Sequence, residues 1–109
     1  MSRIDLIVLN YNDYKTTSKF LEKIKDYKTI DHIVVVDNNS SDDSYELLLK
    51  YKSDKIHVIK SEKNGGYSYG NNYGIKYAIK EFNTEYIIIS NPDVFFEEKV
   101  VDDMKKMYD

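Results

Sequence analysis

A chain of 109 residues with a net charge of −3 and no cysteine has the size of one globular domain without disulfides or thiolate metal sites. Its hydrophobic fraction of 41% and charged fraction of 32% are ordinary for a folded, water-soluble protein, and its acidic balance argues against nucleic-acid binding. Apolar runs fall far short of the roughly 20 residues that span a bilayer, so we expect no transmembrane segment and a cytoplasmic location.

Short β-branched runs alternate with longer segments of helical periodicity. In chain order they predict a strand at 4–9, a helix at 14–27, a strand at 33–36, a helix at 42–51, a strand at 56–59, a helix at 68–82, a strand at 86–89 and a helix at about 97–108. The expected inward faces of the four helices are Phe20, Leu21, Ile24 and Tyr27; Leu47, Leu48 and Tyr51; Ile75, Ala78, Ile79 and Phe82; and Val100, Val101, Met104 and Met107.

This alternation predicts an α/β fold, a three-layer Rossmann-like sandwich with a mostly parallel sheet of about four strands and helices on both faces. In open sheets of this kind, ligands bind outside the carboxyl ends of the strands. The segments that follow the four strands are therefore the places to look for function.

The first two strand ends carry polar and aromatic residues. Asn12 or Asp13 is a candidate cap for the following helix, whereas the ring of Tyr11 is placed to stack on a planar ligand. After the second strand, Ser40 or Ser41 is expected to cap a helix, and Asp42 and Asp43 to complement its dipole. Folding gives no such reason for Asp37 at the strand terminus, and we interpret it as a ligand-binding carboxylate.

The other two strand ends carry glycines and a stiff turn. Gly65 and Gly66 permit a tight turn, while Gly70 and Gly74 allow a strand or ligand to approach the helix closely; the spacing fits neither a phosphate-binding loop nor a dinucleotide fingerprint. Asn91-Pro92-Asp93 ends the fourth strand, and Asp93 is there either as part of an ordinary turn or as the carboxylate that a divalent cation needs beside a diphosphate.

Four motifs at these ends, "VLNYN", "VVVDNNSSDDS", "NGGYSYGNNYGI" and "IIISNPDV", resemble in order and spacing the signature series of family 2 glycosyltransferases, with rhamnosyltransferase-like members as the nearest group. The resemblance runs from about residue 4 to 96 and implies a GT-A fold whose first half binds a nucleotide-diphosphate sugar. Two positions depart from the family pattern. Asn91 replaces the first aspartate of Asp-x-Asp, and Gly70-Asn71-Asn72 stands where many members have Ala-Arg-Asn.

By motif position the resemblance implies that Tyr11 packs on the base, that Asp37 hydrogen-bonds to a uracil or thymine ring, and that Asp93 is the ligand of Mg²⁺ or Mn²⁺. The full set of implied nucleotide-binding positions is Asn10, Tyr11, Asn12, Asp37, Asn39, Asn64, Gly65, Asn72, Gly74 and Asn91. The reaction that it implies is the inverting transfer of a sugar from a UDP or dTDP donor to a hydroxyl of a glycan or lipid-linked acceptor.

Family members place the acceptor site and the catalytic base in a second half, so we interpret residues 1–109 as a single nucleotide-sugar-binding domain truncated before that half. We expect the isolated chain to be inactive and to expose apolar surface that favours self-association. We also expect it to belong to a bacterial protein that is cytoplasmic or peripheral at the inner face of the membrane.

Asp102, Asp103 and Asp109 are expected to be solvated charges rather than a catalytic base. One alternative is a nucleotide-binding module without catalysis. The other is a phospho-receiver-like domain, but such domains carry acidic residues after the first and third strands, where this chain has Asn10 and Lys60.

Overall fold

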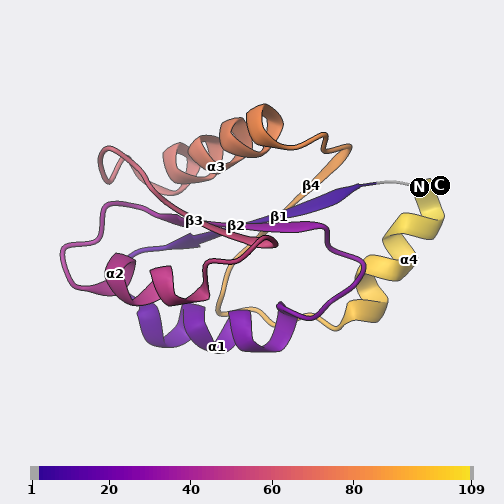
Figure 1. Ribbon diagram of the computed structural model, residues 1–109, viewed down its shortest axis with the longest axis horizontal. Helices are drawn as coiled ribbons and strands as arrows, with labels where there is room; N and C mark the ends of the chain where they lie inside the picture. The colour runs from indigo at the N-terminus through magenta and orange to yellow at the C-terminus, as the bar shows by residue number, and fades with distance from the viewer. Residues whose placement is uncertain (1–2, 109) are drawn as a thin grey trace.

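In the computed structural model, which describes residues 3–108, four strands and four α-helices alternate along the chain (Figure 1). They are β1 (Ile4–Asn10), α1 (Tyr14–Ile24), β2 (His32–Asp37), α2 (Ser44–Leu48) with a 3-10 turn η1 (Leu49–Tyr51), β3 (Ile56–Lys60), α3 (Tyr67–Glu81), β4 (Tyr86–Ser90) and α4 (Glu98–Tyr108). The described strands form one parallel sheet in the order β3-β2-β1-β4, with α3 on one face and α1 and α2 on the other. The predicted three-layer α/β fold is confirmed.

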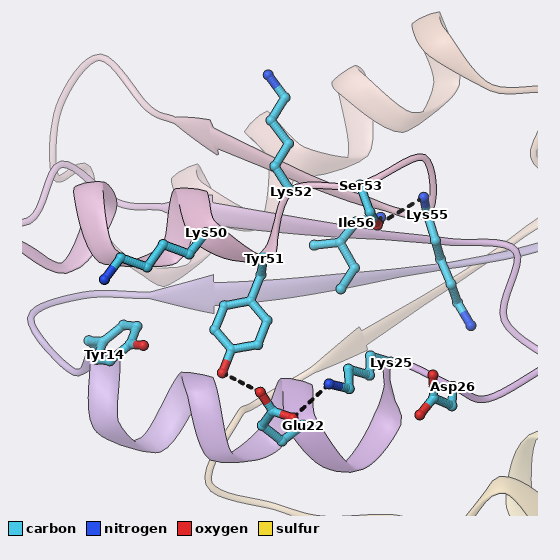
Figure 2. A pocket seen from close by; sticks show the side chains of 10 residues that line it. All are labelled: Tyr14, Glu22, Lys25, Asp26, Lys50, Tyr51, Lys52, Ser53, Lys55 and Ile56. Atoms are coloured by element: carbon cyan, nitrogen blue, oxygen red, sulfur yellow. Dashed lines mark hydrogen bonds and ion pairs between the residues drawn. The ribbon is translucent and has the colours of Figure 1, made fainter.

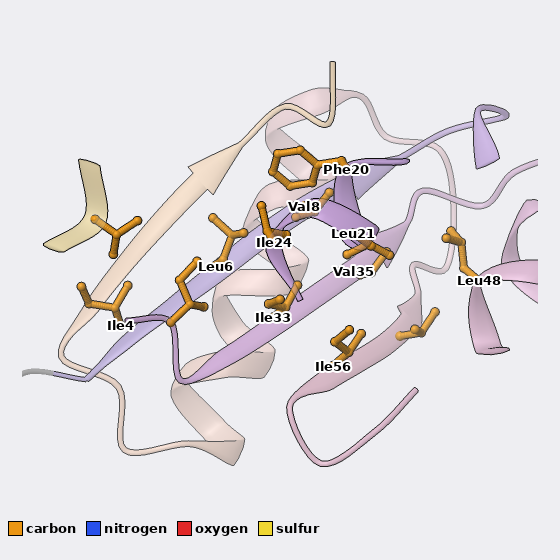
Figure 3. Packing of buried hydrophobic residues seen from close by; sticks show 13 residues of the cluster. Ile4, Leu6, Val8, Phe20, Leu21, Ile24, Ile33, Val35, Leu48 and Ile56 are labelled. Atoms are coloured by element: carbon orange, nitrogen blue, oxygen red, sulfur yellow. The ribbon is translucent and has the colours of Figure 1, made fainter. Parts of the chain in front are cut away.

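The core lies on both faces of the two central strands, because successive side chains of a strand point to opposite sides of the sheet. On the face of α1, Leu6 and Val8 of β1 and Val35 of β2 pack against Leu21 and Ile24 (Figure 3). On the opposite face, Ile7, Val34 and Val36 form a smaller cluster with Ala78 of α3. Each such leucine, isoleucine or valine side chain, when fully buried, contributes on the order of 1.5–3 kcal/mol.

Helix α3 lies close to the sheet because the α3 residues that face the sheet are small. A Cβ atom added at Gly74 would lie 2.7 Å from Cγ2 of Ile7 and 2.7 Å from Cγ2 of Val36. One turn earlier, a Cβ at Gly70 would overlap the Leu9 side chain. The predicted close approach of a strand to this pair of glycines is confirmed.

Three residues assigned to inward helix faces are exposed instead, namely Ile79, Val100 and Met107. In α3, the ridge that meets the sheet is Gly70, Gly74 and Ala78, so Ile79 is turned outward. In α4, Val101 is fully buried while Val100 beside it faces solvent, because this helix buries only a narrow face. Among residues 3–108, no helix is long and apolar enough to cross a membrane.

Candidate functional site

A cleft of about 330 Å³ lies where β1 and β4 end. Both strands run parallel, with Val8 opposite Ser90, so the loops that follow them leave the sheet side by side. The cleft is lined by Tyr11, Thr17, Tyr67, Asn91, Pro92 and Asp93, among others. It thus joins residues of the loops after β1 and β4 with residues of α1 and α3, at the carboxyl ends of the strands, where the fold favours ligand binding.

Two tyrosines give the cleft its aromatic surface. Tyr11 follows β1 and is 45% exposed, and Tyr67 begins α3 and is 54% exposed. Large rings left this open have apolar faces that are not used in the core, and those faces can stack on a planar or sugar ring. The sequence singled out Tyr11 but not Tyr67, whose only signal was its place just after the glycine turn.

One carboxylate is free to meet a cation here. Asp93 is exposed at the cleft, whereas Asp13, which also lines it, accepts a hydrogen bond from the backbone N–H of Thr16 at 3.3 Å and caps α1 as predicted. Within residues 3–108, no group of three or more histidine or acidic side chains is arranged to hold a metal ion. The donor set therefore fits a cation such as Mg²⁺ that takes one carboxylate and completes its shell with diphosphate and water oxygens.

Asp37 lies beside the cleft in a buried chain of hydrogen bonds. The hydroxyl of Thr17 donates to Oδ1 of Asn10 at 2.6 Å, and Nδ2 of Asn10 donates to Oδ1 of Asp37 at 3.0 Å. Ser40 donates twice to the same carboxylate, from its hydroxyl at 2.6 Å and from its backbone N–H at 2.9 Å. Thr17, Asn10 and Asp37 are all buried.

The view that folding gives no reason for Asp37 is therefore wrong, because its carboxylate has three internal donors and fixes the turn after β2. The expected cap is also wrong. Ser40 turns back to Asp37, and the carboxylate of Asp42 accepts instead from the backbone N–H of Ser44, at the start of α2, at 2.9 Å. Hydrogen bonds to Asp42 lower the pKa of that carboxyl, first of all those from Ser44.

Asn12 connects the loop after β1 to the loop after β2. Its Oδ1 accepts from the backbone N–H groups of Ser41 at 2.9 Å and Asp42 at 3.3 Å, and its Nδ2 donates to the Ser41 hydroxyl at 3.0 Å. Asn12 has φ of 50°, in the left-handed region that asparagine tolerates better than most residues. Its side chain is thus committed to holding two strand-end loops together.

Asn38 makes the equivalent connection to the loop after β3. Its Nδ2 donates to Oδ1 of Asn64 at 3.0 Å and to the carbonyl of Gly66 at 3.1 Å, and its Oδ1 accepts from the Ser61 hydroxyl at 3.0 Å. Sequence reasoning missed Asn38. The sequence feature that could have revealed it is the alternation of side chains along β2. Residue 38 points to the same face of the sheet as Val34 and Val36, which is the face that α3 covers.

The structure brings only part of the predicted set to the cleft wall, namely Asn10, Tyr11, Asn91 and Asp93. Asn12, Asp37 and Asn64 are engaged in the loop contacts just described. Asn39 has φ of 58° in the turn after β2, Gly65 lies against the ring of Tyr69, and Asn72 is exposed on α3. Gly74 is buried between α3 and the sheet, and packing alone accounts for it.

A larger groove of about 520 Å³ lies beside the last turn of α1 and the start of β3 (Figure 2). Most of its charged side chains are partnered or directed away from it. Glu22 accepts from Tyr51 at 2.7 Å and pairs with Lys25 at 2.7 Å, while Lys50 and Lys52 extend outward. Burial, with the bond to Glu22, raises the pKa of Tyr51 to about 12. Without converging free groups, this groove is a weaker candidate than the cleft at the strand ends.

Residues 5–109 match the family model described as Glycosyl transferase family 2. The chain belongs to glycosyltransferase family 2. It is similar to the low-salt glycan biosynthesis hexosyltransferase Agl10 of Haloferax volcanii, with 34% identity over 105 residues, which are 96% of this chain and 31% of the relative.

Solved structures show the same fold at lower identity. Residues 1–349 of TarS from S. aureus, in complex with UDP-GlcNAc, align with a TM-score of 0.79 and 24% identity over 95% of this family 2 chain and 30% of TarS 1–349. The mannosyltransferase PcManGT from Pyrobaculum calidifontis, in complex with GDP-Man and Mn²⁺, aligns with a TM-score of 0.74 and 18% identity. The alignment covers 98% of this family 2 chain and 32% of the PcManGT chain. These likenesses confirm the GT-A type of fold, and the chain spans about a third of the length of the relatives that it matches.

Proposed function

We propose that this chain is the donor-binding half of an inverting glycosyltransferase that moves a sugar from a UDP or dTDP donor to a hydroxyl of a glycan or lipid-linked acceptor. The observation that carries the proposal is the cleft at the ends of β1 and β4, which is lined by two exposed tyrosine rings together with Asn91 and Asp93. Aromatic faces can stack on the base of a nucleotide-diphosphate sugar, amide groups can hydrogen-bond to its sugar hydroxyls, and one carboxylate can hold a divalent cation against its diphosphate. The complexes of TarS with UDP-GlcNAc and of PcManGT with GDP-Man add support.

In this proposal each side chain has a separate task. Tyr11 stacks on the base, and Asn91 hydrogen-bonds to the ribose, while Asp93 would hold Mg²⁺ or Mn²⁺ near the diphosphate. When bound there, such a cation would neutralise the negative charge that the diphosphate leaving group gains. The buried chain from Thr17 through Asn10 to Asp37 keeps the loop of Tyr11 in place, so Asp37 acts on the nucleotide by positioning the residues around it.

In this proposal neither Asp102 nor Asp103 of α4 is the general base. Asp103 pairs with Lys99 at 3.0 Å and Asp102 pairs with Lys106 at 3.2 Å, both on exposed parts of the helix, and Asp109 lies outside the described residues. Neither Asp102 nor Asp103 lines the cleft. A base must come within hydrogen-bond reach of the acceptor hydroxyl. We therefore expect no sugar transfer by the isolated chain, and measurable release of UDP from UDP-GlcNAc with an acceptor would contradict this assignment.

Thermal unfolding with UDP and with dTDP, each with and without Mn²⁺, tests the proposal. A nucleotide at about 100 times its dissociation constant should add close to 2.7 kcal/mol of stability. Tyr11→Ala should remove most of the shift, and Asp93→Asn should remove only the part that depends on Mn²⁺. The control is Asp103→Asn, which removes an exposed carboxylate that does not line the cleft and should leave the shift intact. No shift with either nucleotide at millimolar concentration would overturn the proposal.

A further inference from the structure

Two apolar side chains in the segment after β4 are exposed to solvent. Val94 is 60% exposed and Phe95 is 48% exposed. The next residue, Phe96, is anchored, because its ring packs on the core at the α1 face and its carbonyl accepts from the Tyr27 hydroxyl at 2.8 Å. On the other side, the backbone N–H of Val94 donates to the carbonyl of Asn91 at 3.1 Å. A segment anchored at both ends thus presents an apolar pair at the surface.

A row of lysines runs along α1 beside this pair. Lys15, Lys19 and Lys23 follow one another at intervals of four residues, so they share one side of the helix, and all three are exposed. Among residues 3–108, none of the three forms an ion pair, whereas Lys25 pairs with Glu22 at 2.7 Å. Eight residues of helix rise about 12 Å, so three positive charges stand within that length. In a chain of net charge −3, this is a local reversal of sign.

The lysine row and the apolar pair meet in one groove. The ammonium group of Lys23 lies 4.8 Å from the centroid of the Phe95 ring, which is a cation–π contact. The groove has a volume of about 230 Å³ and is also lined by Lys19, Pro92 and Asp93. Because Asp93 lines the cleft at the strand ends as well, the groove borders that cleft. The lysine–phenylalanine surface consists of Lys15, Lys19, Lys23, Val94 and Phe95.

The chemistry of this surface matches the interface of an anionic bilayer. Negatively charged lipid headgroups attract lysines that lie near the membrane, and exposed aromatic and apolar side chains enter the boundary between headgroups and acyl chains. A lysine can keep its ammonium group among the headgroups while its alkyl stem follows a buried ring. Unpaired lysines and an exposed apolar pair together therefore favour a membrane over a purely electrostatic partner such as a nucleic acid.

We propose that the lysine–phenylalanine surface docks this chain onto membranes that contain anionic lipids. Val94 and Phe95 enter the interface, and the three lysines lie against the headgroups. The cleft at the strand ends then lies beside the membrane surface, because Asp93 lines both the cleft and the groove. The inference stands apart from the proposed donor binding, since docking onto a membrane requires no nucleotide.

The test is co-sedimentation of the chain with vesicles of phosphatidylcholine, alone or mixed in equal parts with phosphatidylglycerol, at low and at high salt. We expect the chain to sediment only with the anionic vesicles and to be released at high salt, because salt screens exposed charges. Lys19→Ala combined with Lys23→Ala should lower the partition constant roughly 25-fold, since each lysine near an anionic surface contributes roughly fivefold. Phe95→Ser leaves the charge unchanged and should also weaken binding.

The matched control is Lys50→Ala combined with Lys52→Ala, which removes two exposed lysines outside the lysine–phenylalanine surface and changes the net charge equally. This control should keep nearly all of the binding. All of the substituted residues are exposed, so the variants should fold, and circular dichroism checks that they do.

Three results would overturn the inference. An equal loss of binding in the two double variants would show non-specific attraction of charge, and an unchanged partition of Phe95→Ser would show that the apolar pair does not enter the membrane. Failure of the unsubstituted chain to sediment with anionic vesicles at low salt would exclude membrane docking and leave an acidic protein as the partner of this surface. The thermal shift with UDP is measured without vesicles, so none of these results bears on the donor cleft.

Discussion

Replacing Asp37 by asparagine should destabilise the protein without changing its shape. Oδ1 of Asp37 accepts from Asn10 and from the Ser40 hydroxyl, and Oδ2 accepts from the Ser40 backbone N–H. An asparagine keeps one acceptor oxygen, so its NH₂ group must face at least one of these donors. Hydrogen bonds to a charged acceptor contribute about 1.5–3 kcal/mol each, and a buried donor left unpaired adds to the loss. We expect Asp37→Asn to lower the free energy of unfolding by about 2–3 kcal/mol.

Urea unfolding followed by circular dichroism measures this loss. Asp43→Asn is the matched control, because Asp43 lies in the same loop, is exposed and makes no side-chain hydrogen bond to α2. That variant should remain within about 0.5 kcal/mol of the wild type. A similarly small effect of Asp37→Asn would refute the view that the buried carboxylate holds the loop. If the variant folds, its affinity for UDP then shows whether Asp37 also touches the base.

The remaining predictions concern packing, pH and association. Gly74→Ala gains helix propensity worth up to about 1 kcal/mol, whereas overpacking a core typically costs about 1–3 kcal/mol. Because the added Cβ atom would lie 2.7 Å from the side chains of Ile7 and Val36, we expect chemical denaturation to show a net loss of stability. The pKa of Tyr51 is raised to about 12, so between pH 10 and 12 the folded chain keeps the hydroxyl proton of Tyr51, which the unfolded chain loses near pH 10. Stability is therefore lost as pH rises between 10 and 12, and Tyr51→Phe should make that fall shallower in thermal melts; an unchanged slope would contradict the assignment. The edge strand β4 leaves Ile89 exposed, and we expect light scattering to detect self-association that Ile89→Lys suppresses; a monomer at all concentrations would exclude it.

Periodicity was sufficient to predict the order of the elements, because the buried strands around Ile7 and Val35 are continuous apolar runs and the helices between them carry clear stripes. It failed for Ile79 and Val100, where the contact face is set by neighbours that no local pattern reveals. In α3 those neighbours are the strands beneath Gly70 and Gly74.

The candidate site was predicted in the same uneven way. Tyr11 and Asp93 could be found because an aromatic ring or a carboxylate directly after a strand is placed at the sheet edge by topology alone. The partners of Asp37 were not predicted, since Asn10 meets it through the parallel register of β1 and β2, Ser40 meets it through the turn after β2, and Thr17 joins them through the packing of α1.

The location of bound nucleotide tests the central claim most directly. Titration of the ¹⁵N-labelled chain with UDP and Mg²⁺ reports each backbone amide separately. We expect the largest chemical-shift changes around Tyr11, Tyr67 and Asp93, at the ends of β1 and β4. Changes centred instead on the groove of Lys25 and Lys55 would contradict the placement of the donor site.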